Sequence, residues 1–196
     1  MWTLLPLGNP GPDYARTRHN LGRLMVLRWL DAKGIAPKAL RKLPSGTLYG
    51  LSDRLQALVP ATYMNLSGLA CSEGVKADLD PARFVLLYDD KDLPLGTGRF
   101  RLEGSHGGHN GVRSVQESLG PAPLPRLRLG IGPFERPLSD FVLGTWTEPE
   151  WDRIEALDGP FNRFLELLAG TGHLERLADQ VNPVGFWNGS KGGGSL

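Results

Sequence analysis

Hydrophobic residues follow two patterns along the chain: short unbroken runs and longer stretches with helical spacing. Short apolar runs bounded by turn residues predict buried strands. Six such runs occur, at residues 2–7, 47–51, 55–59, 84–88, 97–102 and 127–131. The second and third runs flank a Ser-Asp-Arg turn, and this arrangement predicts a β-hairpin.

Helical spacing of apolar residues predicts four helices, at residues 19–32, 67–77, 112–119 and 149–169. Asn20 is expected to cap the first helix and Gly34 to end it. The last helix is the longest predicted, with one apolar face formed by Ile154, Leu157, Phe161, Phe164, Leu165 and Leu168. Because strands alternate with helices and a hairpin adds antiparallel pairing, we expect an α/β fold, with a mixed twisted β-sheet packed between α-helices.

The length of the chain, 196 residues, fits a single domain. We expect this domain to span residues 1–182. Residues 183–196 include three consecutive glycines, and we expect them to form a flexible C-terminal tail.

Composition excludes several classes of protein. Cys71 is the single cysteine, so the sequence has neither a disulfide framework nor a four-cysteine metal site. No apolar run approaches the about 18 residues of a membrane span, and residues 1–8 lack the basic leader of a signal peptide, so a cytoplasmic protein is expected. The sequence also lacks the phosphate-binding loop, the dinucleotide-binding glycine motif and the nucleophile elbow of serine hydrolases.

Charge is unevenly distributed although the formal net charge is only +1. Residues 1–54 carry nine basic and three acidic side chains, and residues 95–136 carry six and three. Residues 55–94 and 137–181 are acidic. Basic blocks that share one face attract polyanions, although charge alone favours solvated charges on separate faces. Sixteen of the 22 cations are arginine, which suits forked phosphate contacts.

Polar residues with catalytic chemistry lie near the ends of predicted elements, where α/β proteins build their sites. They include His19, Asn9, Asn65 and Asp89, together with residues 106–111 (HGGHNG). A neutral imidazole takes a proton from water, a carboxylate such as Asp89 holds the imidazole in one tautomer, and carboxamides donate to a developing oxyanion. These groups suffice to hydrolyse an ester with activated water and without a covalent intermediate.

Each of these residues also has a simpler interpretation. A single asparagine is more often a helix cap or a turn residue than a catalytic group. Alternatively, His106 and His109 are two ligands of a metal site that Asp89, Asp90 and Asp92 complete. However, two histidines separated by Gly-Gly do not lie on one helical face, which is the usual arrangement of such a pair.

Several ordered segments identify a family resemblance. They are residues 8–14 (GNPGPDY), 17–22 (TRHNLG), 60–68 (PATYMNLSG), 89–96 (DDKDLPLG), 104–114 (GSHGGHNGVRS), 126–132 (RLRLGIG) and 141–144 (FVLG). In order and spacing they resemble the bacterial-type peptidyl-tRNA hydrolases, from about residue 2 to residue 180. The resemblance implies hydrolysis of the ester between a peptide, or an N-blocked aminoacyl group, and the 3′ end of tRNA, which recycles peptidyl-tRNA that leaves the ribosome. It also implies a monomeric enzyme that needs no metal or cofactor.

The resemblance assigns roles to individual residues. It implies that His19 is the general base and that Asp89 orients it. Two further groups would bind the substrate. The side of the cleft that holds the peptide and the attacking water is implied to be formed by Asn9, Tyr14, Met64, Asn65, His109 and Asn110. Arg101 and Arg128 are implied to bind the tRNA phosphate.

Four residues depart from the family pattern. Pro6 replaces a glycine, Leu27 an acidic residue, Tyr88 a histidine and Glu103 a glycine. None of them removes a proposed catalytic group, although Tyr88 and Glu103 change the surroundings of Asp89 and of the glycine-rich loop. Two other functions remain open from the sequence: a catalytically silent RNA-binding protein of the same fold and a metal-dependent phosphoesterase.

Overall fold

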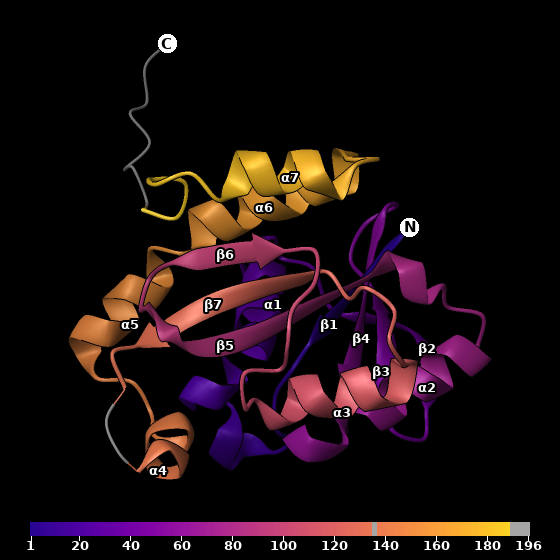
Figure 1. Ribbon diagram of the computed structural model, residues 1–196, viewed down its shortest axis with the longest axis horizontal. Helices are drawn as coiled ribbons and strands as arrows, with labels where there is room; N and C mark the ends of the chain where they lie inside the picture. Colours follow the sequence, from indigo (N-terminus) through magenta and orange to yellow (C-terminus); the bar gives the residue numbers. More distant parts are fainter. Residues whose placement is uncertain (135–136, 189–196) are drawn as a thin grey trace.

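A seven-stranded sheet runs through the computed structural model, which describes residues 1–134 and 137–188 (Figure 1). Its spatial order is β2-β3-β4-β1-β5-β7-β6. β1 pairs in parallel with β4 and β5, β5 pairs in parallel with β7, and the other pairs are antiparallel. The mixed sheet is therefore confirmed, including the hairpin of β3 and β4. The strands are β1 (Trp2–Pro6), β2 (Lys38–Leu43), β3 (Gly46–Gly50), β4 (Leu55–Pro60), β5 (Phe84–Pro94), β6 (Gly98–Arg101) and β7 (Arg126–Gly132).

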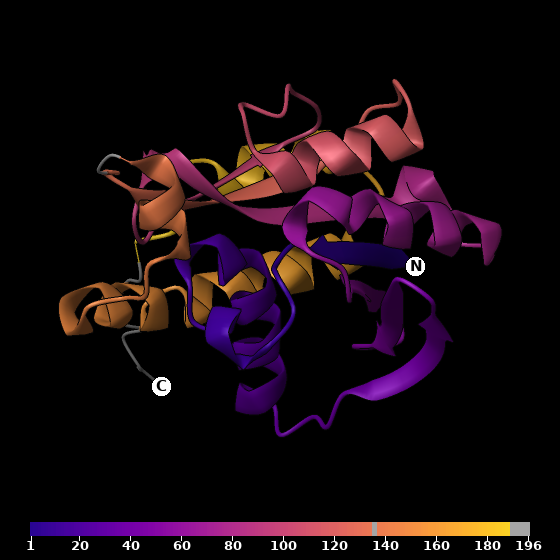
Figure 2. The same cartoon turned by 90° about the horizontal axis from the view of Figure 1, so that it is seen from below.

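Helices cover both faces of the sheet, and the side chains of the central strands alternate between two apolar cores, one on each face. α2 and α3 lie side by side on one face, opposite α6 and α7 (Figures 1 and 2). Leu4 of β1 packs into the core beneath α1 and α6, whereas Leu5 packs into the core beneath α2 and α3. The helices are α1 (Leu21–Ala32), α2 (Ser67–Lys76), α3 (Asn110–Leu119), α4 (Leu138–Leu143), α5 (Glu148–Glu155), α6 (Asp158–Gly170) and α7 (Leu174–Val181).

The prediction of one long helix at residues 149–169 is wrong, because this segment forms two helices, α5 and α6. Pro160 explains the break: it has no N–H to donate to the carbonyl four residues earlier, and its ring clashes with that carbonyl. The predicted apolar face is nevertheless buried along its whole length, from Ile154 to Leu168.

Other boundaries also differ from the sequence prediction. β5 does not end at Tyr88 but continues through the acidic segment to Pro94, and α1 begins at Leu21 after a 3-10 turn at Arg18–Asn20. Strand β2 and the short helices α4 and α7 were not predicted. None of the helices within residues 1–134 and 137–188 has the length and apolar character needed to cross a membrane.

The packed domain extends beyond the boundary expected at residue 182. Trp187 is buried, its ring packs on Phe164 and Phe186, and its Nε1 donates to the carbonyl of Val181 at 2.8 Å. Residues 183–188 therefore belong to the fold, because an indole of this size contributes a large apolar area to the core. The remainder of the expected tail, residues 189–196, lies outside the described residues.

Candidate active site

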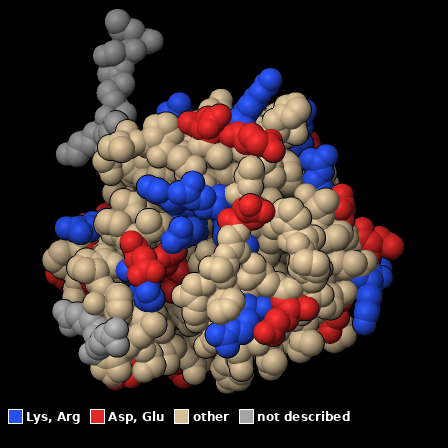
Figure 3. Space-filling view, viewed as in Figure 1, with Lys and Arg blue, Asp and Glu red and all other residues tan. Residues whose placement is uncertain are grey.

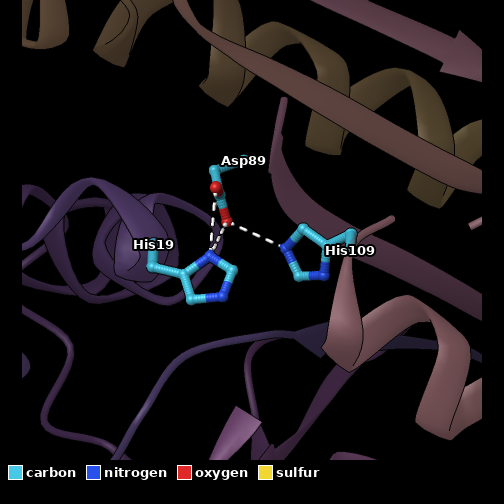
Figure 4. A group of neighbouring side chains, drawn as sticks. All are labelled: His19, Asp89 and His109. Atoms are coloured by element: carbon cyan, nitrogen blue, oxygen red, sulfur yellow. Dashed lines mark hydrogen bonds and ion pairs between the residues drawn. The ribbon is translucent and has the colours of Figure 1, made fainter. Parts of the chain in front are cut away.

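Three segments far apart in the sequence meet at the middle of β5. His19 lies in the 3-10 turn before α1, Asp89 lies on β5, and His109 is the N-cap residue of α3 (Figure 4). Gly22 allows α1 to approach the strand closely, because a Cβ atom there would lie 2.3 Å from the backbone oxygen of Leu87. The chain is thus folded so that the start of α1 rests against β5.

The carboxylate of Asp89 lies between the two imidazoles (Figure 4). Nδ1 of His19 lies 2.9 Å from Oδ1 and 3.1 Å from Oδ2 of Asp89. Nε2 of His109 lies 3.0 Å from the same Oδ1 atom. The Asp89 side chain is only 3% exposed, whereas that of His19 is 13% exposed, so the carboxylate is buried behind imidazoles that reach solvent.

Burial and charge act in opposite directions on this group. Burial by itself raises the pKa of Asp89, but the charges and hydrogen bonds of His19 and His109 hold its pKa well below the ordinary value. Burial by itself lowers the pKa of His19, but the carboxylate of Asp89 outweighs this effect and raises the pKa above 6.5. The site therefore contains an ionised carboxylate and an imidazole of increased basicity.

Hydrogen bonding fixes the tautomer of His109. Its Nδ1 atom accepts from the backbone N–H groups of Gly111 and Val112, at 3.1 and 3.3 Å, and so caps helix α3. An acceptor nitrogen carries no proton, so the hydrogen of the neutral ring is on Nε2 and points at Asp89. His109 therefore donates to the carboxylate through Nε2, while His19 keeps Nε2 free to accept a proton.

A second network joins the end of β1 to the turn that carries His19. Asn20 occupies the predicted N-cap position of α1, but its side chain makes no capping hydrogen bond. Its Oδ1 accepts instead from the backbone N–H of Asn9 at 2.8 Å, and its Nδ2 donates to the carbonyl of Asn9 at 2.9 Å. Oδ1 of Asn9 accepts from the backbone N–H of Met64 at 2.8 Å. Asn9 thus retains its Nδ2 hydrogens for another partner. Met64 lies beside the start of α3, since a Cβ atom on Gly111 would lie 2.5 Å from its sulfur.

A cavity of about 540 Å³ opens beside the carboxylate. It brings together six of the predicted site residues: His19, Asp89, His109, Asn110, Arg101 and Arg128. Such a cavity with converging polar groups is typical of a ligand site. In the space-filling view, basic side chains gather over β6 and β7, with acidic side chains directly below them (Figure 3).

The other four predicted residues are also among the described residues, but they do not line this cavity. Asn9 and Met64 are buried and joined to each other, as above. Tyr14 packs edge-on against Tyr63, with ring centroids 6.2 Å apart. Asn65 is exposed on the 3-10 turn Met64–Leu66 before α2.

The arginines of β7 have different environments, although both point to the cavity. Nε of Arg128 donates to Oδ2 of Asp90, and this ion pair raises the pKa of Arg128 against the opposing effect of burial. Arg126 is 2% exposed, and its Nη1 donates to the carbonyl of Ser105 at 3.1 Å. Arg126 therefore fixes the glycine-rich loop, whereas Arg128 keeps its two Nη groups near the cavity.

Sequence reasoning missed three supporting residues. Asn20 and Arg126 act through the contacts just described. Arg18 lies next to His19, and it forms two hydrogen bonds with Glu150, at 2.9 and 2.8 Å, and packs over the rings of Phe141 and Trp146. The only available signal was position, because Arg18 and Asn20 flank His19 in one segment.

Two of the residues that depart from the family pattern line the cavity. Tyr88 packs edge-on against His109, with ring centroids 5.0 Å apart, and burial raises its pKa although Arg126 partly opposes the shift. Glu103 is exposed at the cavity wall and adds negative charge there.

One group of possible metal ligands occurs among the described residues. His19, Asp89 and His109 offer ligand atoms within 4.8 Å of one another. Nε2 of His109, however, carries the ring proton because Nδ1 is occupied by the amides of α3. A metal at Nε2 would require a tautomer that breaks this cap, so the donor set fits hydrogen bonding better than metal ligation.

Comparisons with known proteins identify the family of the chain. The family model described as peptidyl-tRNA hydrolase matches residues 3–187. A peptidyl-tRNA hydrolase of Chloroflexus aurantiacus is 40% identical over 193 residues, which cover 94% of this chain and all of that protein. One of Methylacidiphilum infernorum is 39% identical and covers 85% of this chain and 90% of its own. The crystal structure of the peptidyl-tRNA hydrolase from Acinetobacter baumannii superposes with a TM-score of 0.80 at 32% identity, over 93% of this chain and 94% of that one.

Proposed function

The chain belongs to the peptidyl-tRNA hydrolase family and is an ester hydrolase that cleaves peptidyl-tRNA, and we propose that His19, held by Asp89, activates the attacking water. The observation that carries this proposal is the 2.9 Å contact between Nδ1 of His19 and Oδ1 of Asp89. It leaves Nε2 of His19 as the proton acceptor, on a residue that lines the cavity.

The reaction proceeds by general base catalysis. Nε2 of His19 takes a proton from water, and the hydroxide oxygen attacks the carbonyl carbon of the ester. When the tetrahedral intermediate breaks down, the bond to the ribose oxygen is cleaved and the imidazolium returns its proton to that oxygen. The products are tRNA with a free ribose hydroxyl and a peptide carboxylic acid, which ionises. No covalent bond to the protein forms.

Carboxamides supply the hydrogen bonds that the developing oxyanion needs. Asn110 lies on the cavity wall next to His109. Asn9 is oriented by the bond from Met64 N–H to its Oδ1, so its Nδ2 is the donor for substrate. Met64, Tyr14 and Asn65 lie near this residue and bind the peptide side of the substrate.

Arg101 and Arg128 bind the 5′-terminal phosphate of tRNA in this proposal. Both line the cavity and extend from neighbouring strands of the sheet. Arginine is a forked donor that matches a phosphate group. Phosphate contacts carry affinity without base specificity, which suits an enzyme that accepts almost every tRNA. The protein acts as a monomer in the cytoplasm, where peptidyl-tRNA is released from ribosomes.

Replacing the base tests the mechanism directly. His19→Ala should lower kcat for an N-acetyl-aminoacyl-tRNA by about 10²- to 10⁴-fold, with little change in tRNA affinity. His173→Ala is the matched control, because this histidine is exposed before α7 and distant in sequence from the site. A His19→Ala enzyme with a near-normal kcat would exclude His19 as the base.

The alternative functions give different results in the same assay. Full cleavage of peptidyl-tRNA in EDTA contradicts a metal-dependent phosphoesterase, and loss of cleavage in EDTA would contradict the proposed mechanism. Binding of tRNA without cleavage by the wild-type protein would identify a silent RNA-binding protein.

A further inference from the structure

Strand β6 lies at the edge of the sheet and pairs with β7 alone among the described strands. The backbone groups of an edge strand that face away from the sheet need another partner. β6 is only four residues long, and after Arg101 the chain enters the glycine-rich loop, where Gly104, Gly107 and Gly108 have positive φ angles. The position of its last residues therefore depends on few hydrogen bonds.

Asn182 supplies the missing partner. Its Oδ1 accepts from the N–H of Phe100 at 2.8 Å, and its Nδ2 donates to the carbonyl of Phe100 at 2.9 Å. One side-chain amide thus satisfies both outward backbone groups of Phe100, as a residue of a further strand would. The two residues are 82 positions apart, so this contact forms only in the folded protein.

The segment around Asn182 is itself anchored against β6. Asn182 follows α7, and its N–H donates to the carbonyl of Ala178. The Trp187 ring lies against Gly98, where a Cβ atom would come within 2.5 Å of the indole. Nε1 of Trp187 donates to Val181, next to Asn182. The amide therefore reaches the strand from a rigid support.

Side-chain alternation connects Phe100 to the cavity. Phe100 is fully buried and packs on Phe164, so Arg99 and Arg101 project from the opposite face of β6. Arg101 is paired across the strands with Arg126, and Arg128 is its diagonal neighbour on the same face. The backbone of Phe100 thus determines where Arg101 stands relative to Arg128.

We propose that Asn182 is a positioning residue for tRNA binding, which acts through the backbone of Phe100 to hold Arg101 at the phosphate site. This inference rests on the proposed phosphate contact of Arg101 and extends it to a residue outside the cavity lining. Asn182 touches neither substrate nor reacting atoms, so its loss should change KM and leave kcat within about twofold.

A double-mutant cycle in the full chain tests the inference. KM and kcat for N-acetyl-aminoacyl-tRNA are measured across a salt series for Asn182→Ala, Arg101→Ala and the double variant. Asn182→Ala should raise KM about three- to tenfold, but it should add less than twofold in the Arg101→Ala background. Asn162→Ala is the matched control, because Asn162 also makes two hydrogen bonds at a helix, with Trp29 and Glu166, away from β6.

Two results would overturn the inference. One is a wild-type KM in folded Asn182→Ala, and the other is an equal rise in KM whether or not Arg101 is present. If Asn182→Ala does not fold, Asn182→Ser with its shorter hydroxyl is measured in the same cycle and judged by the same results. The proposed phosphate contact fails separately, when Arg101→Ala itself leaves KM and its salt dependence unchanged.

Discussion

The side-chain amide of Asn20 forms two hydrogen bonds with the backbone of Asn9, one to its N–H and one to its carbonyl. This pairing joins the loop after β1 to the turn that carries His19. Because Asn20 is 1% exposed, water cannot replace either bond. The relative position of Asn9 and the proposed base therefore depends on one buried side chain.

Asn20→Ala should reduce both stability and activity. It leaves the N–H and carbonyl of Asn9 buried without their partner, which costs about 1–3 kcal/mol of unfolding free energy for each unsatisfied group. Denaturant unfolding and kcat measure the two effects. Asn20→Asp keeps the acceptor for the Asn9 N–H, but it sets a carboxyl oxygen against the Asn9 carbonyl and buries a charge, so it should be at least as destabilising as Asn20→Ala. Wild-type values of both quantities in Asn20→Ala would show that the pairing is dispensable.

Asp89→Asn should move the acid limb of the pH–rate profile to lower pH. Asp89 raises the pKa of His19, and the base is active only when deprotonated, so removal of the carboxylate lets His19 lose its proton at lower pH. The rate at the plateau should also fall, because the tautomer of His19 is no longer held. The profile of kcat/KM against pH measures both changes.

Asp92→Asn provides the charge control for this experiment. It removes the same charge from an exposed residue that pairs with Lys91, and its acid limb should stay near that of the wild type. An acid limb of Asp89→Asn at or above the wild-type position would contradict the assigned role of Asp89.

Arg101→Ala combined with Arg128→Ala should raise KM and reduce its salt dependence. Each phosphate contact that is lost lowers the slope of log KM against log salt by about one. Arg153→Ala provides a matched control, because Arg153 lies on α5 and does not line the cavity. An unchanged slope in the double variant would place the tRNA phosphate elsewhere.

His109 should affect stability and catalysis through different atoms. His109→Ala loses the cap of α3, which costs about 0.5–2 kcal/mol, and also loses the donor to Asp89. His109→Asn keeps a good capping residue, so thermal unfolding should recover while kcat remains reduced. Equal kcat values in His109→Asn and the wild type would show that the hydrogen bond to Asp89 contributes nothing to turnover.

The local spacing of apolar residues predicted most of the fold, because helices and strands that pack against the core have apolar residues at regular intervals. The buried face of α6 is an example. Strand β2 carries no such signal, since five of its six residues are exposed and it is held by pairing with β3. The break before α6 was visible as Pro160, but the continuous apolar face across it concealed the interruption.

The proposed site was only partly accessible to sequence reasoning. Position at element ends suggested His19 and Asp89, and family resemblance added the remaining residues. The pairing of Asn20 with Asn9 depends on a tertiary contact, so the local preference of asparagine for helix caps predicted a different role. Likewise, nothing in residues 126–132 (RLRLGIG) indicated that Arg126 is buried and binds the glycine-rich loop.

The contact between Asn182 and Phe100 has a consequence for how the protein matures during translation. Chains leave the ribosome from the N-terminus, so every group of the proposed catalytic centre is synthesised well before Asn182 and Trp187. The sheet edge that carries Arg101 is completed only when those last residues dock. If Asn182 positions Arg101 as proposed, the part of the tRNA affinity that depends on Arg101 is acquired only after residues 182–187 are synthesised.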